Sequence, residues 1–156
     1  MRQFKNKSLL QLQGFEEFLE RLEEAGASME TEGRKCFEKC AENLYDELYL
    51  KAQKAGLDNR LLEQLEEKFI EVENKNVWYY ECGWKKQKPT ATNPLPDTYK
   101  VMFYNYGTPK RTTKDGANRG EIKKHGFIKK AKLAARNRNK KLQEEAYHKI
   151  IKGLKK

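Results

Sequence analysis

Cysteine and histidine are the residues of this 156-residue chain whose spacing could bind a metal. Cys36 and Cys40 lie one helical turn apart, and His125 or His148 would add the imidazole ligands that zinc accepts beside thiolates. The same spacing places both thiols on the apolar edge of an amphipathic helix, where cysteine behaves as a small buried hydrophobe. With Cys82 the set is odd, which is typical of reduced thiols. The sequence therefore favours core thiols over a zinc site.

Residue patterns typical of catalysis are missing from the sequence. No nucleophile is paired with a base in a recognisable turn, and neither histidine belongs to a hydrolytic motif. The glycines do not form a phosphate-binding fingerprint after a strand. The sequence therefore predicts that the protein is not an enzyme and uses neither a cofactor nor a metal.

Charge divides the chain into two unlike parts. Residues 1–99 carry 15 Lys and Arg against 19 Asp and Glu, whereas residues 100–156 carry 18 against 4. The first part thus has a net charge of −4 and the second of +14, which together give +10. A basic block of this size is typical of a protein that meets nucleic acid, an anionic membrane or an acidic protein, and charge alone does not choose among them.

Two basic segments are the candidate binding regions. In the Gly-rich segment 107–125 the candidate partner-binding residues are Thr108, Lys110, Arg111, Arg119, Lys123 and Lys124. A helical segment contributes the basic residues Lys129, Lys130, Lys132, Arg136, Arg138, Lys140 and Lys141. Among these, Arg136, Arg138 and Lys140 are the candidates whose reversal to Glu is expected to leave folding intact and to block partner binding. The alternative is a solvated face that aids solubility.

An aromatic run, Trp78, Tyr79, Tyr80 and Trp84, allows two interpretations. Beside basic residues it could stack the bases of a single-stranded nucleic acid. Its alternation in a strand favours core packing for one face and leaves the other face for a protein interface.

The elements that must position these residues begin with helices over about 14–67. Apolar side chains at helical spacing predict one helix over 14–26 and a longer one from Ser28, as N-cap, to Gly56. Asp58 is expected to cap a short third helix that contains Leu61, Leu62 and Leu65.

Strands are expected over about 68–106. Alternation around Ile70 and Val72, turn residues at 74–76 and the β-favouring run 77–82 predict a hairpin. Alternation over 99–104 predicts a further strand, and 9–13 a short edge strand. Between them, the Pro-rich segment 89–96 is expected to be a loop. The sheet is thus predicted to be small and antiparallel, with three to four strands.

The C-terminal part is predicted to be a mobile basic loop followed by a long helix. Residues 107–125 have no apolar period, so Lys110–Lys124 is expected to be poorly ordered in the isolated subunit. Helical spacing returns over about 126–153, with Asn137–Asn139 as a candidate kink or break. The chain is therefore predicted to be a single α+β domain over 1–156. It has no apolar run of about 20 residues, so a soluble protein kept inside a cell is expected.

Three segments resemble a known family. They are Tyr99–Arg111, which includes Tyr106-Gly107-Thr108, then Gly126–Ala131 after the Gly-rich basic loop, and the opening Leu10–Phe15. They are similar to the small tail-component family of long-tailed bacteriophages and prophages, which is named for the tenth gene product of a lambdoid phage. The resemblance implies a leading helix pair, a sheet and a closing helix. It also implies that Gly107 serves as the strand exit, Thr108 as a turn or cap residue, and Phe127 as the anchor of the last helix.

The function implied by this resemblance is virion assembly at the neck. The chain would be a tail-completion or head–tail joining subunit acting in an oligomeric ring, made in the host bacterial cytoplasm and then part of the virion tail. Its partners would be copies of itself and neighbouring tail or neck proteins, with no membrane. The alternative is a small basic nucleic-acid-binding protein that uses the Lys/Arg-rich C-terminal helix.

Overall fold

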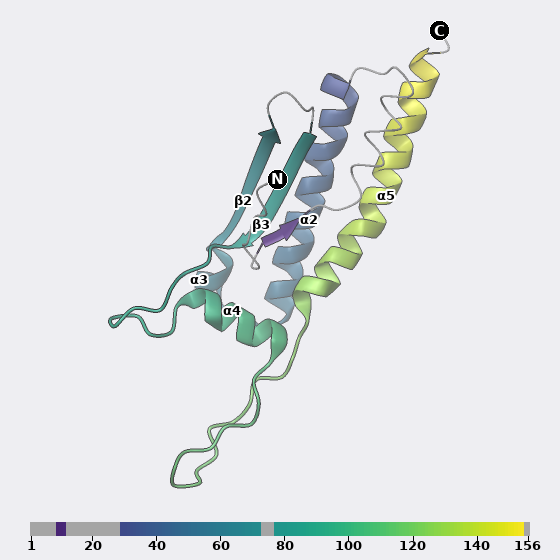
Figure 1. Cartoon of the computed structure of the whole chain (residues 1–156). Coiled ribbons are helices and arrows are strands. Elements are labelled where there is room, and N and C mark those ends of the chain that lie inside the picture. The colour runs from purple at the N-terminus through teal and green to yellow at the C-terminus, as the bar shows by residue number, and fades with distance from the viewer. Residues whose placement is uncertain (1–8, 12–28, 73–76, 155–156) are drawn as a thin grey trace.

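The computed structural model describes residues 9–11, 29–72 and 77–154 of the chain (Figure 1). It is a mixed α and β structure in which helix α2 (Arg34–Lys54) lies between an antiparallel sheet and the long helix α5 (Phe127–Leu154). The mixed fold class and the long C-terminal helix are as predicted. The helix expected at 14–26 falls outside the described residues.

Two strands of eight residues form most of the sheet. β2 (Leu65–Val72) pairs antiparallel with β3 (Val77–Trp84) in a register that joins Leu65 to Trp84 and Val72 to Val77. A three-residue segment, β1 (Leu9–Gln11), pairs with the other edge of β3, which gives the order β1-β3-β2. The hairpin prediction is confirmed, although its turn at 74–76 lies outside the described residues. The sheet has fewer full-length strands than the three to four expected.

The strand predicted at 99–104 is wrong, because this segment forms helix α4 (Asp97–Tyr106). Val101 would be buried in a strand as well as in a helix. The buried residues Thr98, Val101 and Asn105, however, follow helical spacing. Pro96 precedes the helix and Asp97 lies in its first turn, where the helix dipole favours an acid. The sheet therefore ends at Trp84 and does not extend to about 106.

Glycine ends α2 where the sequence predicted. Gly56 has φ of +86°, its N–H donates to the carbonyl of Gln53 at 2.9 Å, and Leu57 N donates to Ala52 O at 3.2 Å. This pair of bonds is a Schellman motif, which satisfies carbonyls that the end of a helix leaves unpaired. At the other end, α2 follows a five-residue π-helical segment, η1 (Met29–Gly33), and the predicted cap Ser28 lies outside the described residues.

The short helix α3 (Asn59–Leu62) is capped by Asp58 as predicted, since the Asp58 carboxylate accepts a hydrogen bond from Leu61 N at 2.9 Å. The helix is shorter than expected. It ends at Leu62, and Leu65 begins β2, so the helical part of this half stops before 67.

The seam between α2 and α5 is the centre of the core. The side chains buried here are small or aliphatic, with alanines on α5. From α2 they include Cys36, Cys40, Leu44, Leu48 and Ala52, and from α5 Ala131, Ala135, Ala146 and Ile150. The prediction of core thiols is confirmed, because all three cysteines are buried. Burial raises the pKa of the Cys82 thiol to about 12, which keeps it protonated at neutral pH.

α5 continues without a break through 137–139, so the break considered there is wrong. Asn139 is 5% exposed; its amide donates to Cys40 O at 3.0 Å and accepts from Asn43 Nδ2 at 3.1 Å. Asn139 thus makes a buried polar contact between the two helices. Because both ends of its amide are hydrogen-bonded, its burial leaves no polar group without a partner. No helix in the described part of the chain is long and apolar enough to cross a membrane.

Candidate protein-interaction site

Residues 107–125 connect α4 to α5 and project beyond both helices, away from the sheet (Figure 1). We call this segment the arm. Its two limbs are joined by backbone hydrogen bonds from Arg111 N to Gly120 O (3.1 Å), from Arg119 N to Arg111 O (2.7 Å) and from Thr113 N to Ala117 O (2.8 Å). The segment is outside helices and named strands, as predicted, but its limbs are cross-linked. Its mobility stays a prediction.

Gly107 and Thr108 close the base of the arm. Gly107 has φ of +78°, and a Cβ there would lie 2.9 Å from Ile122 O and from Lys124 N. Only glycine fits this approach. Thr108 N donates to Ile122 O at 2.9 Å, and Ile122 N donates to Thr108 Oγ1 at 2.9 Å. Gly107 is thus the exit of a helix and not of a strand, and the Thr108 hydroxyl fastens the arm within its own chain.

Asn105 joins the end of α4 to the start of α5. Its backbone carbonyl accepts from Gly126 N at 2.9 Å, and its side-chain oxygen accepts from Ile128 N at 3.0 Å. Because the first N–H groups of a helix have no partner within it, this buried side chain satisfies one of them. No local pattern in the sequence identifies Asn105, because its role depends on a residue 23 positions away.

Phe127 is the buried first residue of α5. Its side chain is 1% exposed, and its ring meets that of Trp84 edge-on with centroids 6.0 Å apart. Trp84 in turn donates its indole N–H to Leu61 O at 2.5 Å. The C-terminal end of the arm therefore joins a helix whose first residue packs against the sheet, next to α3.

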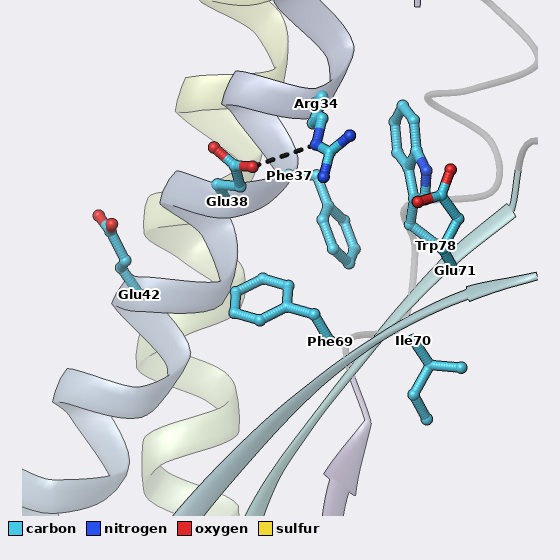
Figure 2. Close-up of a pocket in the computed structure, with 8 residues that line it drawn as sticks. All are labelled: Arg34, Phe37, Glu38, Glu42, Phe69, Ile70, Glu71 and Trp78. Carbon is cyan, nitrogen blue, oxygen red and sulfur yellow. Dashed lines mark hydrogen bonds and ion pairs between the residues drawn. The ribbon is translucent and has the colours of Figure 1, made fainter. Parts of the chain in front are cut away.

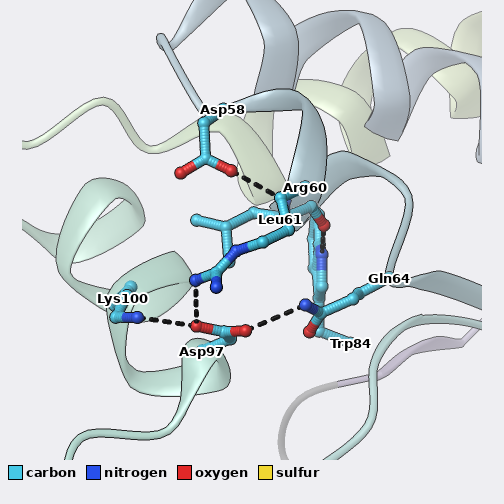
Figure 3. A network of polar contacts seen from close by, with 7 residues as sticks. All are labelled: Asp58, Arg60, Leu61, Gln64, Trp84, Asp97 and Lys100. Atoms are coloured by element: carbon cyan, nitrogen blue, oxygen red, sulfur yellow. Dashed lines mark hydrogen bonds and ion pairs between the residues drawn. The ribbon is translucent and has the colours of Figure 1, made fainter.

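Asp97 holds the start of α4 against α3 (Figure 3). Its carboxylate accepts hydrogen bonds from Gln64 Nε2 at 2.9 Å, Lys100 Nζ at 2.7 Å and Arg60 at 2.9 Å. The hydrogen bonds from Gln64 and Lys100 are the main reason that the pKa of Asp97 lies below its ordinary value. The network fixes the helix from which the arm extends.

Cations cover the arm. Six basic side chains, against two acidic ones, are exposed and make no ion pair with a residue in the described ranges: Lys110, Arg111, Lys114, Arg119, Lys123 and Lys124. The fold thus brings together five of the predicted partner-binding residues. Lys114 was missed, although it stands in the same basic run.

The three candidates on α5 differ from those on the arm. Arg138 pairs at 3.0 Å with Glu47, a largely buried carboxylate that also pairs with Lys51 at 3.6 Å, and Lys140 lies 4.0 Å from Glu144. Only Arg136 of the three makes no ion pair with a described residue. Because Arg138→Glu would place a like charge beside Glu47, we expect the triple reversal to lower the stability of the fold and not to leave it intact.

Comparison with known proteins gives no match. No protein-family model, characterised protein or solved structure matches the chain. Within residues 9–11, 29–72 and 77–154, no group of three or more His, Cys, Asp or Glu side chains is placed to hold a metal ion.

The aromatic run on β3 packs as predicted on one face. Tyr80 and Trp84 are buried and Trp78 is half-buried, whereas Tyr79 is exposed on the opposite face. The core role of the inner face is confirmed. An interface on the outer face stays a prediction.

Proposed function

We propose that this chain is a structural assembly subunit of a bacteriophage or prophage, a tail-completion or head–tail joining subunit that acts in a ring through protein–protein contacts. The arm is the observation that carries the proposal. It is fastened at its base by Thr108 and Gly107, yet its six cations contact no carboxylate in the described part of their own chain. Such a segment is suited to binding an acidic surface on a neighbouring subunit. The resemblance of Tyr99–Arg111 and Gly126–Ala131 to phage tail components supports the same function.

Charge supplies the means of association. One exposed stripe of α2 carries Glu38, Glu42 and Asp46, while the arm of the same subunit is basic. Lys35 and Lys39 are exposed on the same helix, so the acidic surface is limited to this stripe. Unlike surfaces at different places on one subunit produce a head-to-tail contact, which closes into a ring when the rotation between subunits permits. Because an exposed ion pair contributes only about 0–1 kcal/mol, we expect the isolated subunit to associate weakly and the end of the tail to template the ring.

Gene deletion and complementation test this function. The gene is removed from the phage or prophage genome that carries it, and particles are examined by electron microscopy after induction. We expect unjoined heads and tails, with joined particles restored by the wild-type chain. The arm variant, Arg111→Glu with Arg119→Glu, is expected not to restore them.

The matched control is Lys86→Glu with Lys88→Glu, which reverses two exposed charges in the loop between β3 and α4. It should restore joined particles as well as the wild type does. Normal infectious particles from the deletion strain would overturn the proposed function.

Nucleic-acid binding is the second candidate, favoured by the exposed cations that extend from the arm onto α5, including Lys129, Lys130 and Arg136. Contacts to phosphates release counterions, so the affinity for duplex DNA should fall steeply as salt rises. If the arm variant loses such a salt-dependent affinity while still restoring joined particles, nucleic-acid binding replaces ring contact as the role of the arm.

A further inference from the structure

A groove lies between the first turns of α2 and the end of the hairpin (Figure 2). Its volume is about 480 Å³, and its floor is aromatic. The Phe37 ring lies 6.1 Å from that of Phe69 and 6.0 Å from that of Trp78, centroid to centroid. Phe69 is 50% exposed although it faces the helix. Phe37 is buried and Trp78 is half-buried, so Phe69 is the ring of the floor that a partner would contact most.

Carboxylates line the rim of the groove. Glu38 and Glu42 stand on α2 and Glu71 on β2, with a single cation, Arg34, among the lining residues. Arg34 is paired with Glu38 at 3.3 Å. Glu42 and Glu71 make no ion pair with a residue that the structure describes. The rim is therefore negative, with two carboxylates available to a cationic partner.

The arm and the groove lie at opposite ends of the subunit (Figure 1). Trp78 in the groove and Trp84 beside Phe127 are six residues apart on β3, which is about 20 Å at the rise of a strand. The arm then extends away from the groove. Since each limb has about seven residues, its tip lies up to about 20 Å further out. In this conformation the arm of a subunit therefore points away from that subunit's own groove.

We propose that the groove receives the arm of a second copy of this chain, an inference that rests on the proposed function. Arg111 and Arg119 are held opposite each other on the arm by the bond from Arg119 N to Arg111 O. Their guanidinium groups would pair with Glu42 and Glu71, and their planes would lie on the aromatic floor, where a cation is attracted to a ring face.

Charge also favours the arm of a second copy over the chain's own segment 12–28 as the occupant of the groove. That segment carries five glutamates, at 16, 17, 20, 23 and 24, and one arginine, Arg21. It would bring like charge to the negative rim, whereas the arm brings opposite charge. The contact between arm and groove is heterologous, because the two surfaces differ, and it repeats around a ring.

Two complementary variants test the contact in the full-length chain. The arm variant keeps an intact groove, and the groove variant, Glu42→Gln with Glu71→Gln, keeps an intact arm and gives the reversed arm no cation to pair with. We expect wild-type chain at low salt and high concentration to form a series of oligomers in sedimentation velocity, and each variant alone to lose at least about tenfold in self-association. An equimolar mixture should form a dimer of one copy of each and nothing larger, since only one productive contact remains.

The controls and outcomes separate the alternatives. Glu63→Lys with Glu66→Lys, at the far end of the hairpin from the groove, should associate like the wild type. A mixture that stays monomeric overturns the inference. If the groove variant instead lowers thermal stability and leaves self-association unchanged, segment 12–28 occupies the groove; if only the arm variant changes, through lost DNA affinity, the arm binds nucleic acid.

These outcomes are distinct from a failure of the proposed function. Unjoined particles in the deletion strain together with a monomeric mixture would leave the assembly function standing and remove the arm-in-groove contact. Normal particles in the deletion strain with a one-to-one dimer would do the reverse.

Discussion

The apolar α2–α5 seam and the basic arm differ in what happens to their polar side chains. In the seam, Asn139 is buried and makes two hydrogen bonds, and Arg138 forms an ion pair with the nearly buried carboxylate of Glu47. On the arm, backbone groups are paired across the limbs but the charged side chains are not paired within the described chain. The difference indicates that the polar groups of the seam serve folding, whereas the charged groups of the arm are left for a partner.

The anchor of α5 should give the largest effect on folding. Phe127→Ala removes a fully buried ring beside Trp84 and is expected to lower the free energy of unfolding by about 3–4 kcal/mol, measured by chemical denaturation. Ala117→Gly at the tip of the arm is the control and should change it by less than about 1 kcal/mol. Equal losses would mean that the arm contributes to the core.

The seam is tested next by its buried amide. Asn139→Ala leaves Asn43 without its partner and opens a small cavity, so we expect a loss of about 2 kcal/mol by denaturation. Asn137→Ala, on the exposed side of the same helix, should be neutral or slightly stabilising. If both substitutions lower the free energy of unfolding equally, the buried contact of Asn139 does not stabilise the seam.

Gly107→Ala should act mainly on the arm. The added Cβ would meet Ile122 O and Lys124 N at a positive φ, which we expect to cost about 1–2 kcal/mol and to loosen the base. In hydrogen exchange, amides at Arg111 and Arg119 should lose protection while those of β3 keep theirs.

In the wild type, amides of Lys110–Lys124 should already exchange faster than those of β3; equal protection would contradict the expected mobility.

Asp97→Asn should give the smallest change, about 1 kcal/mol at neutral pH, because its three hydrogen-bonding partners lie partly in solvent. The folded state lowers the pKa of Asp97, so its stabilisation is present above the unfolded value of about 3.9 and is lost as the pH falls through the folded pKa. The difference between wild type and variant in denaturation should shrink toward zero in that window. A difference independent of pH would assign the effect to packing.

Local sequence signals determined much of this protein by themselves. The hairpin, the stop at Gly56, the cap at Asp58 and the helix after Phe127 each depend on residues within a few positions, where propensity and backbone geometry decide. The basic run that became the arm was likewise evident from composition. On β2, however, alternation drew attention to Ile70 and missed Phe69, which the register pairs with Tyr80 on the face toward α2.

Only the tertiary structure decided the rest. Alternation over 99–104 fits a strand as well as a helix, and the buried set Thr98, Val101 and Asn105 exists only once α4 has surfaces to pack against. The contact between Asn139 and Cys40 spans 99 positions of the chain, so nothing local predicts it. The groove, too, forms only where α2 meets the hairpin. Such contacts arise from packing between distant segments, and packing overrides local propensity when several elements bury their surfaces together.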